Sequence, residues 1–123
     1  MKKKRKKTIS KIKKKADKVF SEYIRKRDKN ICFTCNKEGN QAGHYISRRY
    51  NNTRYNDVNV HCQCVSCNIF KHGASDVYAL RLQQKYSYEV LHYLNIEKNI
   101  LKQWTIPELE GIVKCYQEKI RNL

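Results

Sequence analysis

The chain has 123 residues, enough for one domain with one modest hydrophobic core rather than two independent domains. Its 27 basic and 11 acidic residues give a formal net charge of +16, which an enzyme of neutral metabolites does not need. Such a charge favours a polyanionic partner: DNA, RNA or an acidic membrane surface. A mean hydropathy of −0.86, with no long apolar run, argues against a membrane-spanning segment. No apolar stretch follows the basic start, so we expect no secretory signal and a reduced, cytoplasmic protein.

The charge is uneven along the chain. The first 30 residues hold 15 basic and 3 acidic residues, whereas the remaining 93 hold 12 and 8. We therefore expect a basic amino-terminal arm and amphipathic helix over residues 1–30, a middle unit over 31–75 and a helical carboxyl-terminal region over 76–123. All three should belong to one compact domain.

The arm continues into an amphipathic helix, predicted from about Ser10 to Arg27. Apolar residues recur there at spacings of three and four, which is the pattern of one buried helical stripe. The stripe consists of Ile9, Ile12, Ala16, Val19, Phe20, Tyr23 and Ile24. The opposite face presents Lys11, Lys14, Lys15 and Lys18, and we expect Lys11, Lys14 and Lys15 to contact nucleic acid. The alternative is a solvated face without a partner.

Helical periodicity stops in the middle unit and returns after it. Short strands are predicted over residues 42–46 and 58–62, and a helix starting near Ser66 or Cys67. Two short helices follow, near residues 77–86 and 88–94. Thr105 and Glu108 have the spacing of a capping box and open a last helix, with Trp104 placed to pack onto it. The fold class expected is α+β and mostly helical.

Two Cys-x-x-Cys pairs give the strongest chemical signal. Cys32 and Cys35 precede Cys64 and Cys67 by a loop of 28 residues, which fits a tetrahedral structural zinc site with four thiolate ligands. The alternative, a pair of redox motifs, would need a βαβ context that the sequence lacks. Cys62 and Cys115 have no partner at ligand spacing and are expected to be plain buried thiols.

Three polar residues stand at suggestive positions around these pairs. His44 lies between them, Asn59 precedes the second pair and Asn68 directly follows its last cysteine. A neutral imidazole can take a proton from a water that attacks phosphorus, and an amide oxygen can bind a hard divalent ion, Mg²⁺ or Mn²⁺. We expect His44 as general base, Asn68 as metal ligand, and Asn59 as the residue that holds the loop presenting His44. This order resembles that of HNH, or ββα-metal, nucleases.

Longer stretches resemble the NinG (Rap) recombination proteins of lambda-like phages, from about residue 16 to the carboxyl end. The matching segments are residues 20–25, Cys32 with Cys35, residues 41–48, residues 59–64 with Cys67 and Asn68, and residues 104–109. The resemblance implies a zinc-stabilised ββα-metal unit flanked by helices on both sides. It also implies a structure-specific endonuclease of phage recombination that acts on Holliday junctions and D-loops in the cytoplasm of the bacterial host.

One residue departs from the general HNH pattern. The position before the base usually supplies a metal ligand, and here it is Gly43. His61 is the nearest candidate for a substitute ligand of the catalytic metal, and Asp57 is a weaker one. A structural or phosphate-facing role is the alternative for His61.

Basic residues next to the expected catalytic strand suit phosphate binding. Arg48, Arg49 and Arg54 are predicted to contact the DNA backbone, since guanidinium groups bind phosphate oxygens in pairs. No base-reading pattern is visible, so recognition of backbone and shape is expected. Symmetric cleavage of a four-way junction would need two active sites, which favours a homodimer through the helical carboxyl-terminal region. The alternative function is a non-catalytic zinc-finger protein that binds DNA; an RNA-binding protein is supported by charge alone.

Overall fold

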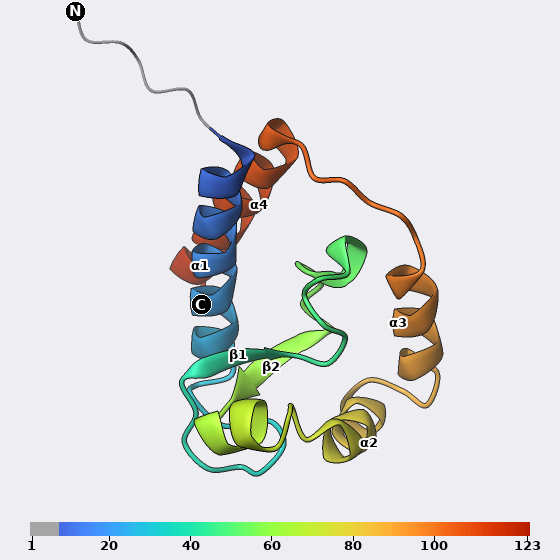
Figure 1. Cartoon of the computed structure of the whole chain (residues 1–123). Coiled ribbons are helices and arrows are strands. Elements are labelled where there is room, and N and C mark those ends of the chain that lie inside the picture. Colours follow the sequence, from blue (N-terminus) through green and yellow to red (C-terminus); the bar gives the residue numbers. More distant parts are fainter. Residues whose placement is uncertain (1–7) are drawn as a thin grey trace, which may run out of the picture.

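The computed structural model describes residues 8–123, so the basic segment at residues 1–7 lies outside the described residues. As predicted, the described chain is mostly helical with one small antiparallel sheet of two strands (Figure 1). The elements in order are α1 (Ile9–Arg27), β1 (Gln41–His44), the short 3₁₀ turn η1 (Asn51–Thr53), β2 (Val60–Gln63), the π-helical turn η2 (Ser66–Phe70), α2 (Ser75–Lys85), α3 (Val90–Lys98) and α4 (Ile106–Arg121).

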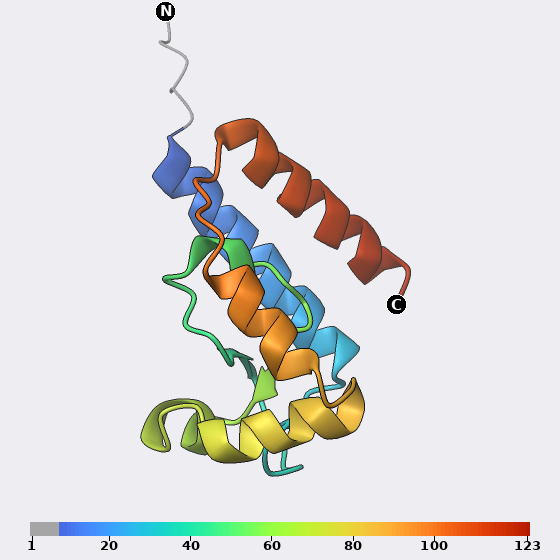
Figure 2. The same cartoon turned by 90° about the vertical axis from the view of Figure 1, so that its right-hand side faces the viewer.

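Helix α1 forms where the sequence predicts it. The hydroxyl of Thr8 caps its first turn by accepting from the Lys11 N–H at 3.2 Å. Its apolar stripe packs against α4 and against the sheet, so the first and last helices lie side by side (Figures 1 and 2). Phe20 lies at the centre of this contact, edge-on to Tyr55 and Tyr116 with ring centroids 5.7 and 4.8 Å away.

Helix α4 begins with the predicted capping box. The Thr105 hydroxyl accepts from the Glu108 N–H, and the Glu108 carboxylate accepts from the Thr105 N–H. Trp104 packs edge-on against Tyr55 and donates its indole N–H to the carbonyl of Asn51 at 3.0 Å. The contact of Trp104 therefore joins the start of α4 to the loop between the strands.

A second, smaller core lies on the other side of the sheet. Tyr78 and Leu82 of α2 pack against Val90 and Leu94 of α3, and all four are buried. The sheet thus separates two apolar clusters, one built by α1 and α4 and the other by α2 and α3. None of the helices within residues 8–123 is both long and apolar enough to cross a bilayer.

The register of the two strands decides which side chains share a face. Gly43 pairs with His61, and His44 pairs with Val60. Alternate residues of a strand point to opposite faces, so His44 lies on the α1 side of the sheet and His61 on the α2 side.

Both strands are shorter or shifted relative to the prediction, at residues 41–44 and 60–63 instead of 42–46 and 58–62. The side chain of Asn59 explains the early end of β1. Its amide oxygen accepts from the Ile46 N–H at 2.8 Å, and its amide nitrogen donates to the Ile46 carbonyl at 3.0 Å. The Asn59 side chain thereby makes the two hydrogen bonds to Ile46 that a backbone partner would make if the strand pair continued.

The helix predicted to start near Ser66 is a single π-helical turn. It ends at three successive residues with positive φ: His72 at 50°, Gly73 at 90° and Ala74 at 48°. A left-handed backbone cannot continue a right-handed helix, so η2 stops there and α2 begins in a new direction.

Candidate functional site

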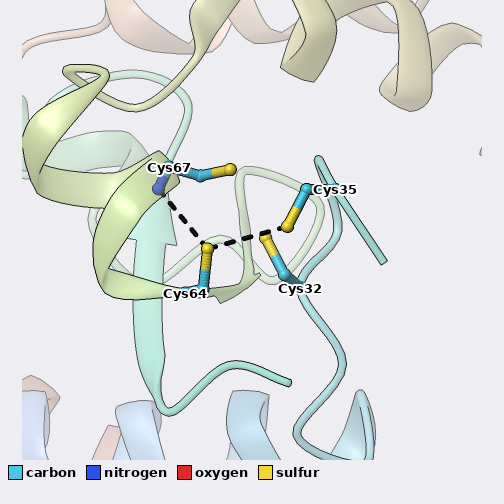
Figure 3. Close-up of side chains that lie close together, drawn as sticks. All are labelled: Cys32, Cys35, Cys64 and Cys67. Atoms are coloured by element: carbon cyan, nitrogen blue, oxygen red, sulfur yellow. Dashed lines mark hydrogen bonds between the residues drawn. The ribbon is translucent and has the colours of Figure 1, made fainter. Parts of the chain in front are cut away.

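The four paired cysteines converge at one end of the sheet, as the spacing predicts. Their Sγ atoms all lie within 4.8 Å of one another (Figure 3). Four Zn–S bonds of about 2.3 Å would place tetrahedral sulfurs roughly 3.8 Å apart. The Cys35 and Cys64 sulfurs are already 3.7 Å apart, so the cluster can hold a structural ion such as zinc with little movement.

The chemistry of these thiols also favours a cation. Burial alone would raise the pKa of Cys32, but hydrogen bonds from the Thr34 hydroxyl and from backbone N–H groups lower it to about 6. The Lys37 N–H lowers the pKa of Cys35, yet burial and the neighbouring sulfurs outweigh it and raise that pKa to about 12. The pKa of Cys67 is also raised, by burial first and by the neighbouring Cys64 and Cys32 sulfurs. One thiolate thus forms readily while Cys35 and Cys67 resist ionisation, and a bound zinc ion would remove the repulsion between thiolates.

The two remaining cysteines differ from each other. Cys62 is buried, and burial raises its pKa to about 11, which agrees with a plain buried thiol. Cys115 is exposed, so the prediction that it is buried is wrong. It lies on α4 one residue before the buried Tyr116, on the face of that helix turned to solvent.

A cleft of about 350 Å³ lies between α1, the end of β1 and η2. It brings together three of the residues singled out in the sequence, His44, Asn68 and Arg48, although 24 positions separate the first two. The other lining residues are Asp17, Phe20, Ser21, Ala42 and Ser47. A histidine, an amide and a guanidinium that face one cleft of this size can contact a single phosphodiester.

The ring of His44 is held by a single backbone group. Its Nε2 lies 2.9 Å from the carbonyl oxygen of Arg54. A carbonyl only accepts, so Nε2 carries the proton and donates, and Nδ1 of the neutral ring is left as an acceptor. The tautomer needed for a base is therefore set by the loop between the strands.

The surroundings keep this imidazole neutral. Burial lowers the pKa of His44, and the positive charges of Arg54 and Arg48 lower it further. The Arg54 carbonyl and the Asp17 carboxylate act in the opposite direction but do not prevail. At neutral pH His44 is thus unprotonated and able to accept a proton.

An ion pair between Asp17 and the Arg54 side chain fixes the position of the Arg54 carbonyl that accepts from His44. The Arg54 guanidinium binds both Asp17 oxygens, with Nε to Oδ1 at 2.9 Å and Nη2 to Oδ2 at 2.5 Å, and its Nη1 donates to the Arg48 carbonyl at 2.9 Å. The Tyr55 hydroxyl also donates to Asp17 at 2.8 Å. Arg54, predicted to contact phosphate, instead uses its Nε, Nη1 and Nη2 to donate within the protein.

Asn59 is buried and holds the loop that follows β1. Besides its two bonds to Ile46, its amide donates to the Thr53 carbonyl at 3.2 Å. The Thr53 carbonyl directly precedes Arg54, whose own carbonyl receives the His44 N–H. Asn59 thus lies behind the loop whose Arg54 carbonyl receives the His44 N–H.

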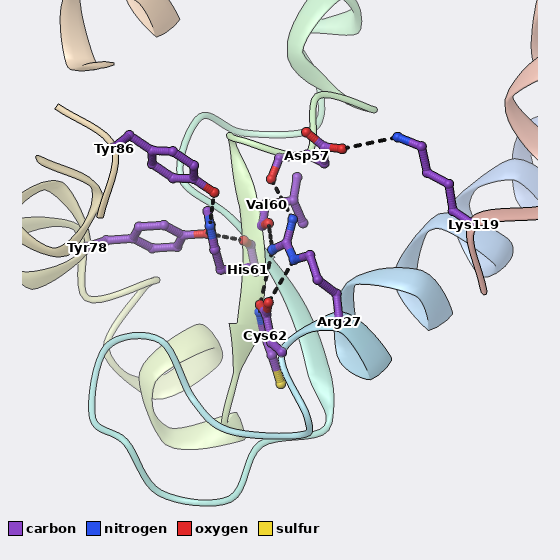
Figure 4. A network of polar contacts seen from close by, with 10 residues as sticks. Arg27, Asp57, Val60, His61, Cys62, Tyr78, Tyr86 and Lys119 are labelled. Carbon is purple, nitrogen blue, oxygen red and sulfur yellow. Dashed lines mark hydrogen bonds and ion pairs between the residues drawn. The ribbon is translucent and has the colours of Figure 1, made fainter. Parts of the chain in front are cut away.

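His61 is not part of the cleft. Its ring is buried on the α2 side of the sheet, stacked on Phe33 at 4.1 Å and placed between the Tyr78 and Tyr86 hydroxyls (Figure 4). The Tyr78 hydroxyl donates to the Gly43 carbonyl at 2.7 Å, so it accepts from His61 Nδ1, and Nε2 accepts from Tyr86. Both ring nitrogens are used, and the assignment of His61 as a catalytic metal ligand is corrected to a structural one.

Asp57, the weaker candidate ligand, also lies elsewhere. Its carboxylate pairs with Lys119 of α4 at 3.6 Å, and its carbonyl accepts from Arg27 (Figure 4). Arg27 donates a second bond to the Val60 carbonyl at 2.8 Å, which fastens the end of α1 to β2. Asp57 therefore belongs to the packing between α1, α4 and the sheet.

The structure explains why residue 43 is glycine. A Cβ at this position would lie 1.8 Å from the amide oxygen of Gln63. The Gln63 side chain fills that space because its amide nitrogen is fixed by the Thr34 hydroxyl at 3.1 Å and the Gly73 carbonyl at 2.9 Å. The packing thus excludes a side chain at position 43 that could bind a metal. Any metal held by Asn68 must take its other ligands from elsewhere.

The exposed basic residues divide into two groups. Arg48 lines the cleft, whereas Arg49 lies outside it and donates to the Tyr50 hydroxyl at 3.1 Å. On α1, the exposed Lys11, Lys14 and Lys18 follow one another at spacings of three and four, and Ser21 at the cleft comes next in that row. Lys15 is exposed beside the groove between α1 and α4.

Fold and cluster together define a small, strongly basic α+β protein with a cluster of four cysteines that could hold a metal ion. A family model described as "Bacteriophage Lambda NinG protein" matches residues 1–123. The chain therefore belongs to the NinG family of lambdoid phage proteins.

Individual relatives agree with this assignment. Protein ninG of Escherichia phage lambda is 31% identical over 115 residues, which cover 89% of this chain and 56% of that protein. Protein ninG of Escherichia phage 933W is 30% identical over 115 residues, covering 89% and 57%. Protein ninG of Salmonella phage P22 is 28% identical, covering 89% and 56%. The chain spans about half the length of these relatives, and no solved structure matches it.

Proposed function

We propose that this NinG-family chain is a structure-specific DNA endonuclease of the HNH, or ββα-metal, type, which hydrolyses phosphodiester bonds in branched DNA during phage recombination. The observation that carries the proposal is the cleft shared by His44, Asn68 and Arg48 beside a four-cysteine cluster. Two strands followed by a helical turn, with the histidine at the end of the first strand and the amide on the turn, is the arrangement expected for such a unit.

His44 would act as the general base. Its Nδ1 takes a proton from a water molecule, while its Nε2 keeps the bond to the Arg54 carbonyl. The water oxygen attacks phosphorus in line with the 3′ oxygen, whose bond to phosphorus breaks, and the departing 3′ oxygen takes a proton from a solvent water. The products carry a 5′ phosphate and a 3′ hydroxyl. Arg48 binds a non-bridging oxygen of the same phosphate.

A divalent ion, Mg²⁺ or Mn²⁺, would stabilise the charge on the leaving 3′ oxygen. Asn68 can supply one ligand oxygen, because its amide nitrogen is held by the Gln41 side chain at 2.8 Å and its oxygen is thereby directed. Asp17 is engaged by Arg54, and Gly43 offers no side chain. The remaining ligands must then come from phosphate and water, as is common for Mg²⁺.

The alternative is a non-catalytic zinc-finger protein that binds DNA. The absence of a ligand at Gly43 favours it, whereas the neutral, braced His44 favours the nuclease. Charge and cysteine cluster fit both functions.

The test is cleavage of a four-way junction, a flap and a linear duplex by the purified full chain with Mg²⁺ or Mn²⁺. We expect nicks in the branched substrates near the branch point, and products that ligate without prior phosphorylation because they carry a 5′ phosphate. Tight binding of all three DNAs without any nick would overturn the nuclease and establish the alternative.

A four-way junction has two equivalent strands to cut. We therefore propose a homodimer on that substrate, with one cleft for each strand and the helical carboxyl-terminal region as the interface. Sedimentation of the complex with a junction should show two chains per DNA; one chain per DNA would contradict this part of the proposal.

A further inference from the structure

The turn η2 presents two large apolar side chains to solvent, one and two residues after Asn68 of the cleft. Ile69 is 53% exposed and Phe70 is 75% exposed, and they follow Asn68 of the cleft without a gap. In Figure 2 this yellow-green turn projects from the molecule at the lower left, just before the start of α2. Burial of apolar surface is favourable, so a contiguous exposed pair next to a binding cleft indicates a contact surface.

The pair is carried by a braced turn. The metal ligands Cys64 and Cys67 precede it, and the Asn68 N–H donates to the Cys64 carbonyl at 2.9 Å. After it, the Gly73 N–H donates to the Cys67 carbonyl at 2.8 Å, and the Gly73 carbonyl accepts from Gln63. Phe70 is therefore held outward by backbone bonds and, when zinc is bound, by the metal as well.

The charge around the pair indicates what it contacts. Lys71 is exposed next to it, Asp76 follows in the first turn of α2, and the chain as a whole carries a formal net charge of +16. An exposed aromatic side chain on a strongly basic protein matches nucleic acid, where phosphates surround the faces of the bases.

Building on the DNA-cleaving role above, we propose that Phe70, supported by Ile69, stacks on a base exposed at the branch point of the DNA. In a regular duplex each base is covered by its neighbours, and insertion must unstack a step. At a junction or flap the outermost base pair has a free face, so stacking there carries no such cost. Phe70 would thus select branched over linear DNA and place the branch at a fixed distance from His44.

The test measures binding separately from cleavage, with Ca²⁺ in place of Mg²⁺. Phe70→Ala should bind a four-way junction about tenfold more weakly than the unaltered chain, and linear duplex equally well. Phe70→Trp should restore junction binding. Tyr88→Ala is the matched control: it removes an aromatic side chain that is 82% exposed at the other end of α2, and it should change neither affinity.

A second readout reports on the base itself. 2-Aminopurine placed at the branch point should change its fluorescence when the unaltered chain binds, but not when Phe70→Ala binds. Equal junction affinity for Phe70→Ala and the unaltered chain would overturn the proposal. So would a change of Phe70→Ala from dimer to monomer in the absence of DNA, since the pair would then be a protein interface. Both readouts work without strand scission, so they stand or fall independently of the nuclease activity.

Discussion

At the scale of single residues, the cleft depends on side chains that act through another residue. Asp17 never needs to touch DNA, yet it binds the Arg54 guanidinium, and the Arg54 carbonyl fixes His44. No pattern in the sequence distinguishes this aspartate, since it lies within a basic helix and meets Arg54 only in the folded chain. The one feature that sets Asp17 apart in the sequence is that it is an acidic residue surrounded by lysines.

Asp17→Asn tests this support. The Asp17 charge raises the pKa of His44, so its removal should lower that pKa further and move the acid limb of the cleavage profile to lower pH. The looser Arg54 should also reduce the rate roughly tenfold or more. Glu22→Gln on the same helix, where the carboxylate pairs with Lys26 on the surface, is the control and should leave the profile unchanged. An unshifted acid limb in Asp17→Asn would contradict the assigned role.

His61 makes a prediction about stability. Burial lowers its pKa from 6.5 to about 3, so between these values the unfolded chain binds a proton that the folded chain does not. Its contribution to stability is thus complete above pH 6.5 and is lost as the pH falls toward 3, by about 1.4 kcal/mol per pH unit. Urea titrations from pH 7.5 to 5, with zinc in excess, should show a smaller slope for His61→Gln than for the unaltered chain. Equal slopes would contradict the burial of a neutral His61.

At the scale of elements, periodicity predicts the long helices well. The stripe of α1 and the capping box of α4 are local features, and both appear within about a residue of their predicted positions. The short strands and η2 are placed less accurately, because their ends are set by contacts distant in sequence. Asn59 ends β1, and a left-handed segment after residue 71 ends η2.

The same distinction applies to the candidate site. The convergence of the four cysteines follows from their spacing, since each pair is local and a tetrahedral ion would need four ligands. The face of the sheet occupied by His61 follows from the register, which a sequence containing only two short strands does not specify. The register therefore decides whether His61 faces the cleft, where it could bind a metal, or is buried on the other side of the sheet as a structural residue.

The cysteine cluster is expected to hold the middle unit together. Cys64→Ser should lose the ion and, with it, more than about 3 kcal/mol of stability, because the binding free energy of such an ion is largely folding free energy. Hydrogen exchange should become fast in residues 30–74. Cys115→Ser changes an exposed thiol outside the cluster and is the control. Unchanged stability in Cys64→Ser, or less than about half an ion per native chain, would contradict a structural metal.

At the scale of the whole molecule, basic residues reach the cleft along α1. The row of exposed lysines ends at Ser21 of the cleft, and six further basic residues stand before the described part of the chain, within residues 1–7. In the proposed function, these basic residues would attract the phosphates of any DNA, while the cleft and Phe70 would act at one position. The overall charge would then account for affinity and the small central unit for specificity.

Removal of residues 1–7 separates these contributions. Lysine contacts to phosphate act through counterion release, so the slope of log affinity against log salt should become shallower by up to about 5. Replacing the six basic residues with glutamine should have the same effect. The rate of scission at saturating protein should stay within about twofold. An unchanged salt slope would show that the DNA is bound elsewhere.

The most direct test of the central claim is single-turnover cleavage of a four-way junction by His44→Ala. The imidazole acts in the transition state and adds little to ground-state binding. We therefore predict a loss of rate of a hundredfold or more, with zinc content, thermal unfolding and junction affinity unchanged. His92→Ala, an exposed histidine on α3, should cleave at the normal rate. Full activity of His44→Ala would contradict the account and leave the cleft without a catalytic role.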